Sequence, residues 1–334
     1  MKMTVYSAQS YDERFLNEAF DTLPDAHLVQ RNYQKARLTA ETVALAEGAV
    51  AVCVFVNDVL SADVLQALST HGVKAVLLRC AGFNNVDLAM AKKLGFFVAR
   101  VPSYSPEAVA EHTLALIMTL NRHTHRAYLR VREGNFMLEG LLGSTLHGKT
   151  IGIIGIGKIG LAVARIFKGI GCRVLGYDPS RSPEFERIGE YFEREAVMAQ
   201  ADIVTLHCPL TDDTRYLINA NTLSTMKPGA MLVNTSRGAL IDTPAVIAAL
   251  KTRHLGSLAI DVYEQENELF FQDRSSDIID DDIFERLLTF PNVLVTGHQG
   301  FFTIEAMREI ANVTMHNWLC FSDGTYCENL VPQH

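Results

Sequence analysis

Three polar side chains could together perform acid–base chemistry on a small anion. Each of them follows a predicted strand. The carboxyl ends of parallel strands meet at one edge of a sheet, and ligands of open α/β sheets bind at that edge. We therefore expect the three side chains to lie together. With the strand that each one follows, they are Arg237 (230–234), Glu266 (257–260) and His298 (293–296).

The chemistry that fits these groups is proton transfer to a carbonyl oxygen that neighbours a carboxylate. An imidazolium, with an ordinary pKa of about 6.5, can give up a proton near neutral pH, and we assign this role to His298. A carboxylate on the other ring nitrogen would orient the ring and favour its charged form, which suits Glu266. The planar guanidinium of Arg237 can bind two carboxylate oxygens at once, which a lysine cannot do. Taken singly, each residue type is more often a surface or core residue, so the interpretation depends on all three together.

A glycine-rich turn predicts where a dinucleotide would bind. Gly155, Gly157 and Gly160 follow the apolar strand 150–154 and open the helix 158–170 with Gly-x-Gly-x-x-Gly spacing. The first glycine permits a tight turn, the second lets the backbone approach a pyrophosphate, and the third lets the helix pack on the strand. The alternative is a turn that serves only the fold.

An acid at the end of the next strand favours the dinucleotide interpretation and indicates which dinucleotide binds. The strand 173–177 leads into Asp178, whose carboxylate could bond both ribose hydroxyls of NAD and would repel the extra phosphate of NADP. Arg181, three residues later, could weaken this preference. We predict NAD as the cofactor.

The elements that must position these groups alternate between strands and helices, which is typical of parallel α/β sheets. We predict two doubly wound parallel-sheet domains of the Rossmann or flavodoxin-like type, with a cleft between them. The other strands are expected at 1–6, 49–56, 75–78, 96–101 and 203–207. The other helices are expected at 58–71, 86–94, 193–198, 221–226 and 244–253.

Three further segments stand out by composition. Residues 107–121 are apolar almost all round, which predicts a helix buried between layers or against a partner. Residues 265–282 contain seven acids and one arginine, which predicts a solvated insertion. His123 and His125 lie among arginines at four-residue spacing, which indicates a polar helix face, either solvated or in a subunit contact.

Length and composition exclude several classes of protein. The 334 residues, 48% apolar and 20% charged, have room for two domains and exclude wholesale disorder. The net charge of −8 gives no attraction to nucleic acid or anionic membranes, so the expected partner is a small molecule or another copy of the chain. The six cysteines are scattered without metal-ligand spacing, so we expect neither zinc nor disulfides, and the cytosol is the expected location.

Several longer motifs together resemble one known family. Besides the glycine turn they are Arg79–Asp87 (RCAGFNNVD), Val101–His112 (VPSYSPEAVAEH), His207–Leu210 (HCPL), Asn234–Asp242 (NTSRGALID) and Asp261–Glu264 (DVYE). With these motifs the chain resembles the D-isomer-specific 2-hydroxyacid dehydrogenases over essentially its whole length, and most closely their fermentative D-lactate branch.

The resemblance implies a nucleotide domain inserted into a discontinuous catalytic domain, with the active site in the cleft. The catalytic domain would comprise residues 1–100 and 299–334, and the NAD-binding domain residues 101–298. Residues 107–148 would form the interface of a homodimer or a dimer of dimers.

The resemblance also assigns binding residues and implies the roles given above to the arginine, glutamate and histidine. The N–H groups around Ala81 and Gly82 would bind the substrate carboxylate, while Tyr104 and Phe301 would line the pocket for its side chain. Besides the glycines and Asp178, cofactor contacts would come from Lys158, Ile159, His207, Cys208, Pro209, Thr214, Thr235, Ser236 and Asp261.

The implied activity is the reversible, NADH-dependent reduction of pyruvate to D-lactate, with the proton coming from His298. Many relatives have proline where this chain has Gly297 and Asn267, and these departures bear on substrate preference because neither removes a catalytic group. One alternative is a reductase of another small 2-oxo acid, such as glyoxylate, hydroxypyruvate or a branched oxo acid. A second is an NADH-sensing binding protein like the corepressors that share this scaffold, although the net acidity argues against it.

Overall fold

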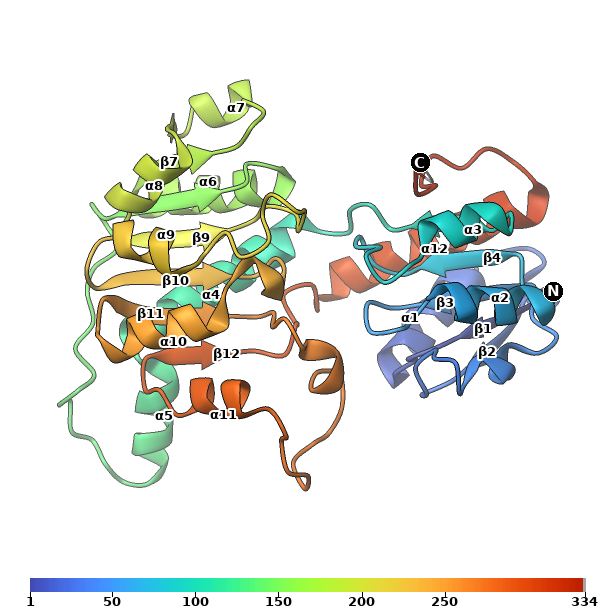
Figure 1. Cartoon of the computed structure of the whole chain (residues 1–334), viewed down its shortest axis with the longest axis horizontal. Helices are drawn as coiled ribbons and strands as arrows, with labels where there is room; N and C mark the ends of the chain where they lie inside the picture. The colour runs from blue at the N-terminus through green and yellow to red at the C-terminus, as the bar shows by residue number, and fades with distance from the viewer. Residues whose placement is uncertain (333–334) are drawn as a thin grey trace. The chain divides into compact units, whose positions relative to one another are not determined.

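The structure is a computed structural model that describes residues 1–332, and they form two compact units (Figure 1). One unit comprises residues 1–105 and the chain from Phe302 onward, and the other comprises Pro106–Phe301. The second unit is therefore inserted into the first. The chain changes unit slightly later than the expected limits of 100 and 298, because residues 101–105 precede the first helix of the second unit and residues 299–301 stay with that unit's loops.

The first unit is built on a five-stranded parallel sheet with the order β2-β1-β3-β4-β5. The central strand β3 and its neighbour β4 are buried along their whole length, which explains their continuous apolar sequences. The strands are β1 (Lys2–Val5), β2 (Gln30–Tyr33), β3 (Ala51–Val54), β4 (Ala75–Leu78) and β5 (Phe97–Arg100).

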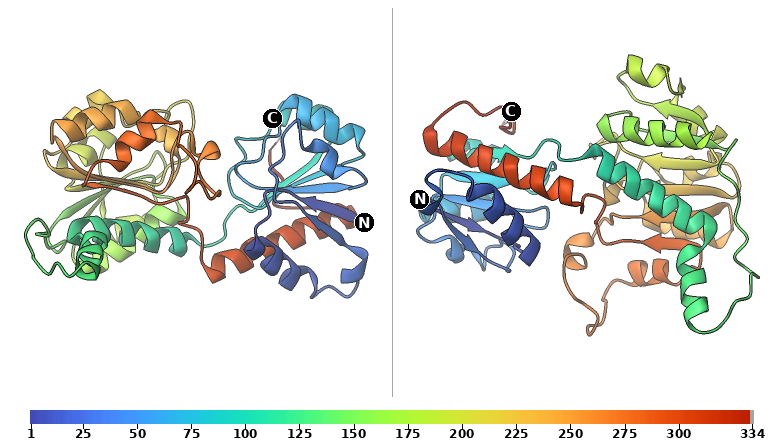
Figure 2. Two further views of the ribbon diagram at one scale, coloured as in Figure 1. Left: turned by 90° about the horizontal axis from the view of Figure 1, so that it is seen from below. Right: turned by 180° about the vertical axis from the view of Figure 1, so that it is seen from behind.

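Helices cover both faces of this sheet, as Figure 2 shows. Helices α1 and α12 pack together on one face, where the ring centroids of Phe20 and Trp318 are 6.4 Å apart, and α2 and α3 lie on the other. The long C-terminal helix thereby joins the two ends of the chain in one core. The helices are α1 (Ser10–Phe20), α2 (Ala62–Thr70), α3 (Leu88–Lys93) and α12 (Ile304–Asp323).

The second unit contains a seven-stranded parallel sheet with the order β12-β11-β10-β9-β6-β7-β8. The order reverses beside β6, so the chain winds in both directions from that strand, as in a nucleotide-binding sheet. Six of the strands were predicted, whereas the two-residue edge strand β8 is too short to show a pattern. The strands are β6 (Thr150–Ile154), β7 (Arg173–Tyr177), β8 (Glu190–Tyr191), β9 (Ile203–Leu206), β10 (Ala230–Asn234), β11 (Leu255–Ile260) and β12 (Val293–Val295).

Two buried clusters, one on each face, hold the helices of the second unit against its sheet. One cluster joins α4 and α6 to the sheet and the other joins α8, α9 and α10, and Figure 2 shows these two layers. The helix expected over 107–121 is α4, which buries one face against the sheet, whereas Ala115 and Met118 on its other face are exposed. The helices are α4 (Pro106–Arg122), α5 (Thr124–Arg132), α6 (Lys158–Ile170), α7 (Pro183–Glu186), α8 (Arg194–Gln200), α9 (Ala220–Thr225), α10 (Thr243–Lys251) and α11 (Asp282–Leu288).

The acidic segment 265–282 is mostly exposed, as its charge predicted, but it is not a free loop. Phe270 is buried against Tyr263 and Phe284, and the Asp281 carboxylate caps α11 through the N–H groups of Ile283 and Phe284. The segment is thus anchored at both ends beside the carboxyl edge of the sheet. Among the described residues, no helix combines the length and apolar character needed to cross a membrane.

Candidate active site

The loops after β11 and β12 bring Glu266 and His298 into direct contact. The Nδ1 atom of His298 lies 2.7 Å from Oε1 of Glu266, and Oε2 of Glu266 accepts from the N–H of Tyr263 at 2.9 Å. Since an ionised carboxylate can only accept, Nδ1 carries a proton in this pair and donates it. Glu266 is therefore held from both oxygens, and the Nε2 atom of His298 takes no part in this pair.

Aromatic rings surround the imidazole of His298. The ring of Phe301 is 6.4 Å away, centroid to centroid, in a T-shaped arrangement, and that of Phe271 is 5.8 Å away and tilted. Phe301 was expected near the substrate, whereas Phe271 was not, because its acidic neighbours indicated a solvated segment. Apolar rings beside the pair reduce its exposure to water, and the side chains of His298 and Glu266 are each only 16% exposed.

The backbone of His298 is held in an unusual conformation. Its φ angle is 52°, in the left-handed region, which costs a residue with a side chain about 1–2 kcal/mol. The N–H of His298 donates to the carbonyl of Asp261 at 2.7 Å, which helps to maintain this conformation. Gly297 does not supply the turn by a positive φ of its own, and a Cβ atom there would meet no atom within 4 Å.

The carboxylate of Asp261 organises the loop that carries His298. Its Oδ1 accepts from the Thr296 hydroxyl and, at 2.9 Å, from the N–H of Gln299, while Oδ2 accepts from the N–H of Gly300 at 2.8 Å. Burial by itself would raise the pKa of Asp261, but hydrogen bonds from His112 and Thr296 outweigh it, so the pKa lies below its ordinary value. A buried, charged carboxylate thus connects β11 to the turn after β12.

Arg237 lies in the loop after β10, beside the segment that leads to Glu266. Its Nη1 donates to the carbonyl of Ser236 at 2.7 Å, and the Asn234 amide donates to the carbonyl of Arg237 at 2.8 Å. A Cβ atom on Gly238 would lie 2.1 Å from the carbonyl carbon of Tyr263. Only glycine at this position therefore allows the loop after β10 to lie against the loop after β11. The second unit therefore places the loops of Arg237, Glu266 and His298 at one edge of its sheet.

The glycine turn after β6 has the shape that a dinucleotide requires. A Cβ atom on Gly155, whose φ is 96°, would lie 2.6 Å from the backbone nitrogen of Cys208, and one on Gly160 would lie 2.0 Å from the carbonyl oxygen of Gly155. By contrast, a Cβ atom on Gly157 would meet nothing within 4 Å. The first and third glycines are thus needed for packing, and the second leaves open space at the N-terminus of α6, where a pyrophosphate can bind.

Asp178 lies against this turn. Its Oδ2 accepts from the N–H of Ile156, inside the glycine motif, at 2.7 Å, and its Oδ1 accepts from the N–H of Ser180 at 2.8 Å. The carboxylate is therefore held beside the glycine turn by two backbone N–H groups. The guanidinium of Arg181 lies 5.5 Å from the ring centroid of Tyr191 and pairs weakly with Glu186 at 4.0 Å.

The other residues expected at the cofactor fall on three neighbouring loops. The Ser236 hydroxyl donates to the carbonyl of Cys208 at 2.6 Å, and the Thr214 hydroxyl donates to the carbonyl of Pro209 at 2.7 Å. Thr235 is buried and lies 3.0 Å, oxygen to oxygen, from Thr113 of α4. Lys158 and Ile159 are the first two residues of α6.

His207 is a neutral member of this group. Burial of its ring lowers the pKa of His207 to about 3, and its Nε2 lies 2.9 Å from the Thr205 hydroxyl. At physiological pH the imidazole therefore adds no positive charge to the loops around the glycine turn.

Ala81, Gly82 and Tyr104 belong to the first unit. The guanidinium of Arg100 holds the turn after β4, because Nη1 donates to the carbonyl of Ala81 at 2.8 Å while the group lies over the ring of Phe83 at 5.0 Å. The carbonyl of Gly82 accepts from the thiol of Cys80 at 3.3 Å. The carbonyls of Ala81 and Gly82 therefore both accept hydrogen bonds from side chains of the first unit.

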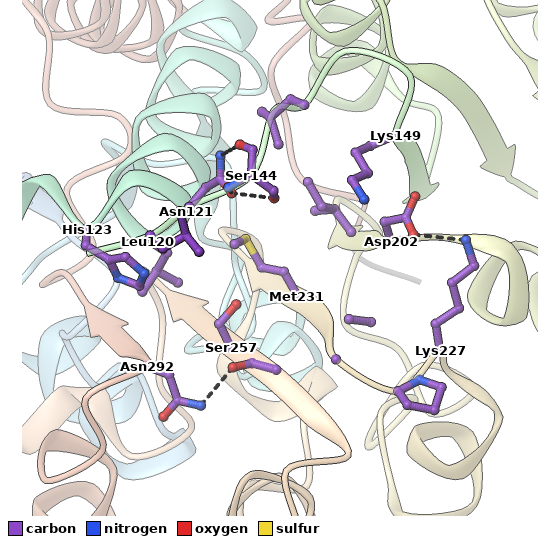
Figure 3. Close-up of a pocket in the computed structure, with 18 residues that line it drawn as sticks. Leu120, Asn121, His123, Ser144, Lys149, Asp202, Lys227, Met231, Ser257 and Asn292 are labelled. Atoms are coloured by element: carbon purple, nitrogen blue, oxygen red, sulfur yellow. Dashed lines mark hydrogen bonds and ion pairs between the residues drawn. The ribbon is translucent and has the colours of Figure 1, made fainter. Parts of the chain in front are cut away.

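A separate cavity of about 510 Å³ opens at the amino-terminal edge of the same sheet (Figure 3). Lys149, Met231 and Ser257 are in its lining, together with Lys227 and Asp202, whose Nζ and Oδ1 atoms are 3.0 Å apart. Its lining includes none of the site residues predicted from the sequence. The predicted chemistry and this cavity lie at opposite ends of the strands.

Comparison with known proteins identifies the relatives of the chain. A family model described as "D-isomer specific 2-hydroxyacid dehydrogenase, NAD binding domain" matches residues 114–300. "D-lactate dehydrogenase kk1H" of Curvularia clavata is 55% identical over 333 residues, which cover 100% of this chain and 96% of that protein.

Two solved structures share the whole fold. The apo-structure of D-lactate dehydrogenase from Escherichia coli has a TM-score of 0.90 at 46% identity and covers 99% of this chain and 100% of its own. A structure titled as the identification of the pyruvate reductase of Chlamydomonas reinhardtii has a TM-score of 0.92 at 41% identity and covers 98% of both chains.

Proposed function

We propose, from the premise that this chain belongs to the D-isomer-specific 2-hydroxyacid dehydrogenase family, that it reduces pyruvate to D-lactate with NADH. The chain is an oxidoreductase that uses NAD. The observation that carries the proposal is the hydrogen bond between Nδ1 of His298 and Glu266, which leaves Nε2 as the proton donor. The names of the Curvularia clavata and Chlamydomonas reinhardtii relatives support the choice of pyruvate.

NAD fits the residues of the glycine turn. The open space at Gly157 and the free N–H groups at the start of α6 would take the pyrophosphate, and Asp178 would bond the ribose. When bound, the reduced cofactor supplies the hydride.

In the proposed reaction the protein donates a proton, orients the proton donor and binds the substrate carboxylate. As hydride reaches the carbonyl carbon of pyruvate, Nε2 of His298 gives its proton to the carbonyl oxygen, so the product is a hydroxyl group and the imidazole becomes neutral. Glu266 stabilises the imidazolium before transfer and keeps the ring oriented. Arg237, with the N–H groups of Ala81 and Gly82, holds the substrate carboxylate.

Tyr104 and Phe301 are the side chains that we expect around the methyl group of the substrate. Two large rings favour a small substituent over a branched one, and this size argument separates pyruvate from the branched oxo acids.

The testing experiment is a substrate panel with NADH and NADPH side by side. We expect the highest kcat/KM with pyruvate and NADH, with D-lactate as the product on a chiral column. A higher kcat/KM with glyoxylate, hydroxypyruvate or a branched oxo acid would show that this acid, and not pyruvate, is the preferred substrate. L-lactate as the product would refute the proposed stereochemistry. Cofactor binding with negligible turnover of every oxo acid would favour a sensing protein.

A further inference from the structure

A second histidine, His112 on α4, contacts the loop that carries His298 and has no part in the reaction above. Its Nε2 lies 3.1 Å from Oγ1 of Thr296 and 3.3 Å from Oδ1 of Asp261. Helix α4 is distant in sequence from both residues and lies across the face of the sheet, so the contact joins two separate elements. His112 is 14% exposed and Asp261 2% exposed, so the contact is shielded from water.

The hydrogen bonds determine which nitrogen of His112 carries a proton. The Thr296 hydroxyl has one hydrogen and donates it to Oδ1 of Asp261. The hydroxyl oxygen can therefore only accept from His112, and a carboxylate can only accept as well. Nε2 of His112 must be protonated, and its N–H is shared between Thr296 and Asp261.

Asp261 transmits this contact to His298. Its carboxylate accepts from the N–H groups of Gln299 and Gly300, and its backbone carbonyl accepts from the N–H of His298. A Cβ atom on Gly300 would lie 3.0 Å from Oδ2 of Asp261 and 3.5 Å from Cδ2 of His112, so these groups are packed without space between them. The left-handed conformation of His298 lies in the middle of this network.

We propose that His112 is a positioning residue, which holds Asp261 and Thr296 so that the loop 296–300 presents His298 in its left-handed conformation. For its effect on catalysis the inference rests on the proposed function, whereas its effect on the loop does not. Since His112 acts through other residues, its loss should slow proton transfer more than it weakens NADH binding, to which Asp261 is also expected to contribute. Displacing a catalytic group by a fraction of an ångström to 1 Å can cost up to about 100-fold in rate.

The test compares four variants of the full-length protein. His112→Leu removes the shared N–H, His112→Gln keeps an N–H donor at a similar reach, and Thr296→Val removes the hydroxyl. Glu111→Gln changes the exposed neighbour of His112 on α4 and serves as the matched control.

The first readout is hydrogen–deuterium exchange of the amides of residues 298–300, measured without substrate or cofactor. We expect faster exchange in His112→Leu and Thr296→Val, and wild-type exchange in His112→Gln and Glu111→Gln. Thermal unfolding of each variant separates a local effect on the loop from general destabilisation. Wild-type exchange in both His112→Leu and Thr296→Val would overturn the proposal.

The second readout is steady-state kinetics with pyruvate, together with the Kd of NADH from fluorescence. We expect kcat of His112→Leu to fall about 10- to 100-fold, with recovery to within about threefold in His112→Gln. A weaker Kd for NADH with unchanged exchange would contradict the proposal, because His112 would then act on the cofactor. If the wild-type protein did not reduce pyruvate, the proposed function would fail, while the exchange experiment would still decide the role of His112.

Discussion

At the scale of single residues, the proposed chemistry depends on Nε2 of His298, because the other ring nitrogen is bonded to Glu266. Oε1 of Glu266 accepts a hydrogen bond from Nδ1 of His298, which leaves Nε2 as the nitrogen that we expect to face the substrate. The guanidinium of Arg237 has five N–H donors, and the carbonyl of Ser236 accepts from one of its nitrogen atoms. Each residue is therefore oriented by a backbone or carboxylate partner before any substrate arrives.

Replacing His298 tests the proton donor directly. His298→Gln keeps the size and polarity of the side chain but cannot give up a proton, so we expect kcat for pyruvate to fall by about 10²–10⁴. The Kd of NADH should stay within about twofold of the wild-type value, since the glycine turn is untouched. Stopped-flow measurement of NADH oxidation is the appropriate assay, and a variant with normal turnover would show that another group supplies the proton.

At the scale of elements, the three glycines of the turn between β6 and α6 have different roles, because two are needed for packing and one leaves space for a ligand. Gly155 and Gly160 are needed because any side chain would strike neighbouring backbone, whereas Gly157 faces open space. The same motif thus contains residues whose substitution should affect stability and one whose substitution should affect binding.

Two alanine variants test this difference. Gly157→Ala should fold with a wild-type melting temperature but bind NADH at least about tenfold more weakly, because its methyl group would occupy the position of the pyrophosphate. Gly155→Ala should lower the melting temperature, because its φ of 96° and the backbone nitrogen of Cys208 leave no room for a methyl group. Tight NADH binding by Gly157→Ala would mean that the pyrophosphate does not bind at this turn.

The turn after β12 predicts a particular dependence of stability on pH. The pKa of Asp261 in the folded protein lies below its ordinary value of 3.8, so its ionised form stabilises the fold above that pH. The advantage of the wild-type protein over Asp261→Asn should therefore be full at neutral pH and decline only as the pH falls below about 3.8 and through the folded pKa. Urea unfolding midpoints at several pH values measure this difference. An advantage that grew on acidification would contradict the assignment.

At the scale of the whole molecule, the segment after α5 leaves apolar side chains in water. Arg130 on α5 holds this segment by donating to the carbonyl of Glu139 at 2.7 Å, and Asn121 donates to the carbonyl of Ser144 at 2.7 Å. The exposed apolar residues of α5 and the segment are Tyr128, Leu129, Val131, Phe136, Met137, Leu138 and Leu142. An ordered backbone that presents so many apolar groups is typical of a surface for another subunit, and we propose that residues 107–148 form the homodimer interface.

Charge at this surface should prevent dimerisation. Leu138 and Leu142 are 82% and 92% exposed, so the double variant Leu138→Asp with Leu142→Asp should fold normally and run as a monomer where the wild-type protein runs as a dimer or larger assembly. Ile278→Asp, at a position 86% exposed in the acidic segment, is the matched control and should not change the assembly. Size-exclusion chromatography with light scattering gives the masses, and an unchanged assembly in the double variant would place the interface elsewhere.

The sequence by itself determined the features that local spacing encodes. The alternation of apolar strands and helices, the glycine turn with Asp178, and the types of Arg237, Glu266 and His298 could all be predicted, because each depends on residues close together in the chain or on the general rule that parallel strands present their carboxyl ends at one edge. Strands β4, β6, β7 and β10 begin and end at the predicted residues for the same reason.

Only the tertiary structure decided how the site is held. The contact of His112 with Asp261 and Thr296 and the approach of Phe271 to His298 join segments far apart in sequence, and they exist because α4 and the acidic segment pack beside the same sheet edge. The left-handed backbone of His298 is uncommon for a residue with a side chain, and the hydrogen bond from the N–H of His298 to the carbonyl of Asp261 helps to hold it. Local patterns could therefore predict which loops carry the candidate groups, whereas long-range packing fixes the direction in which those groups point.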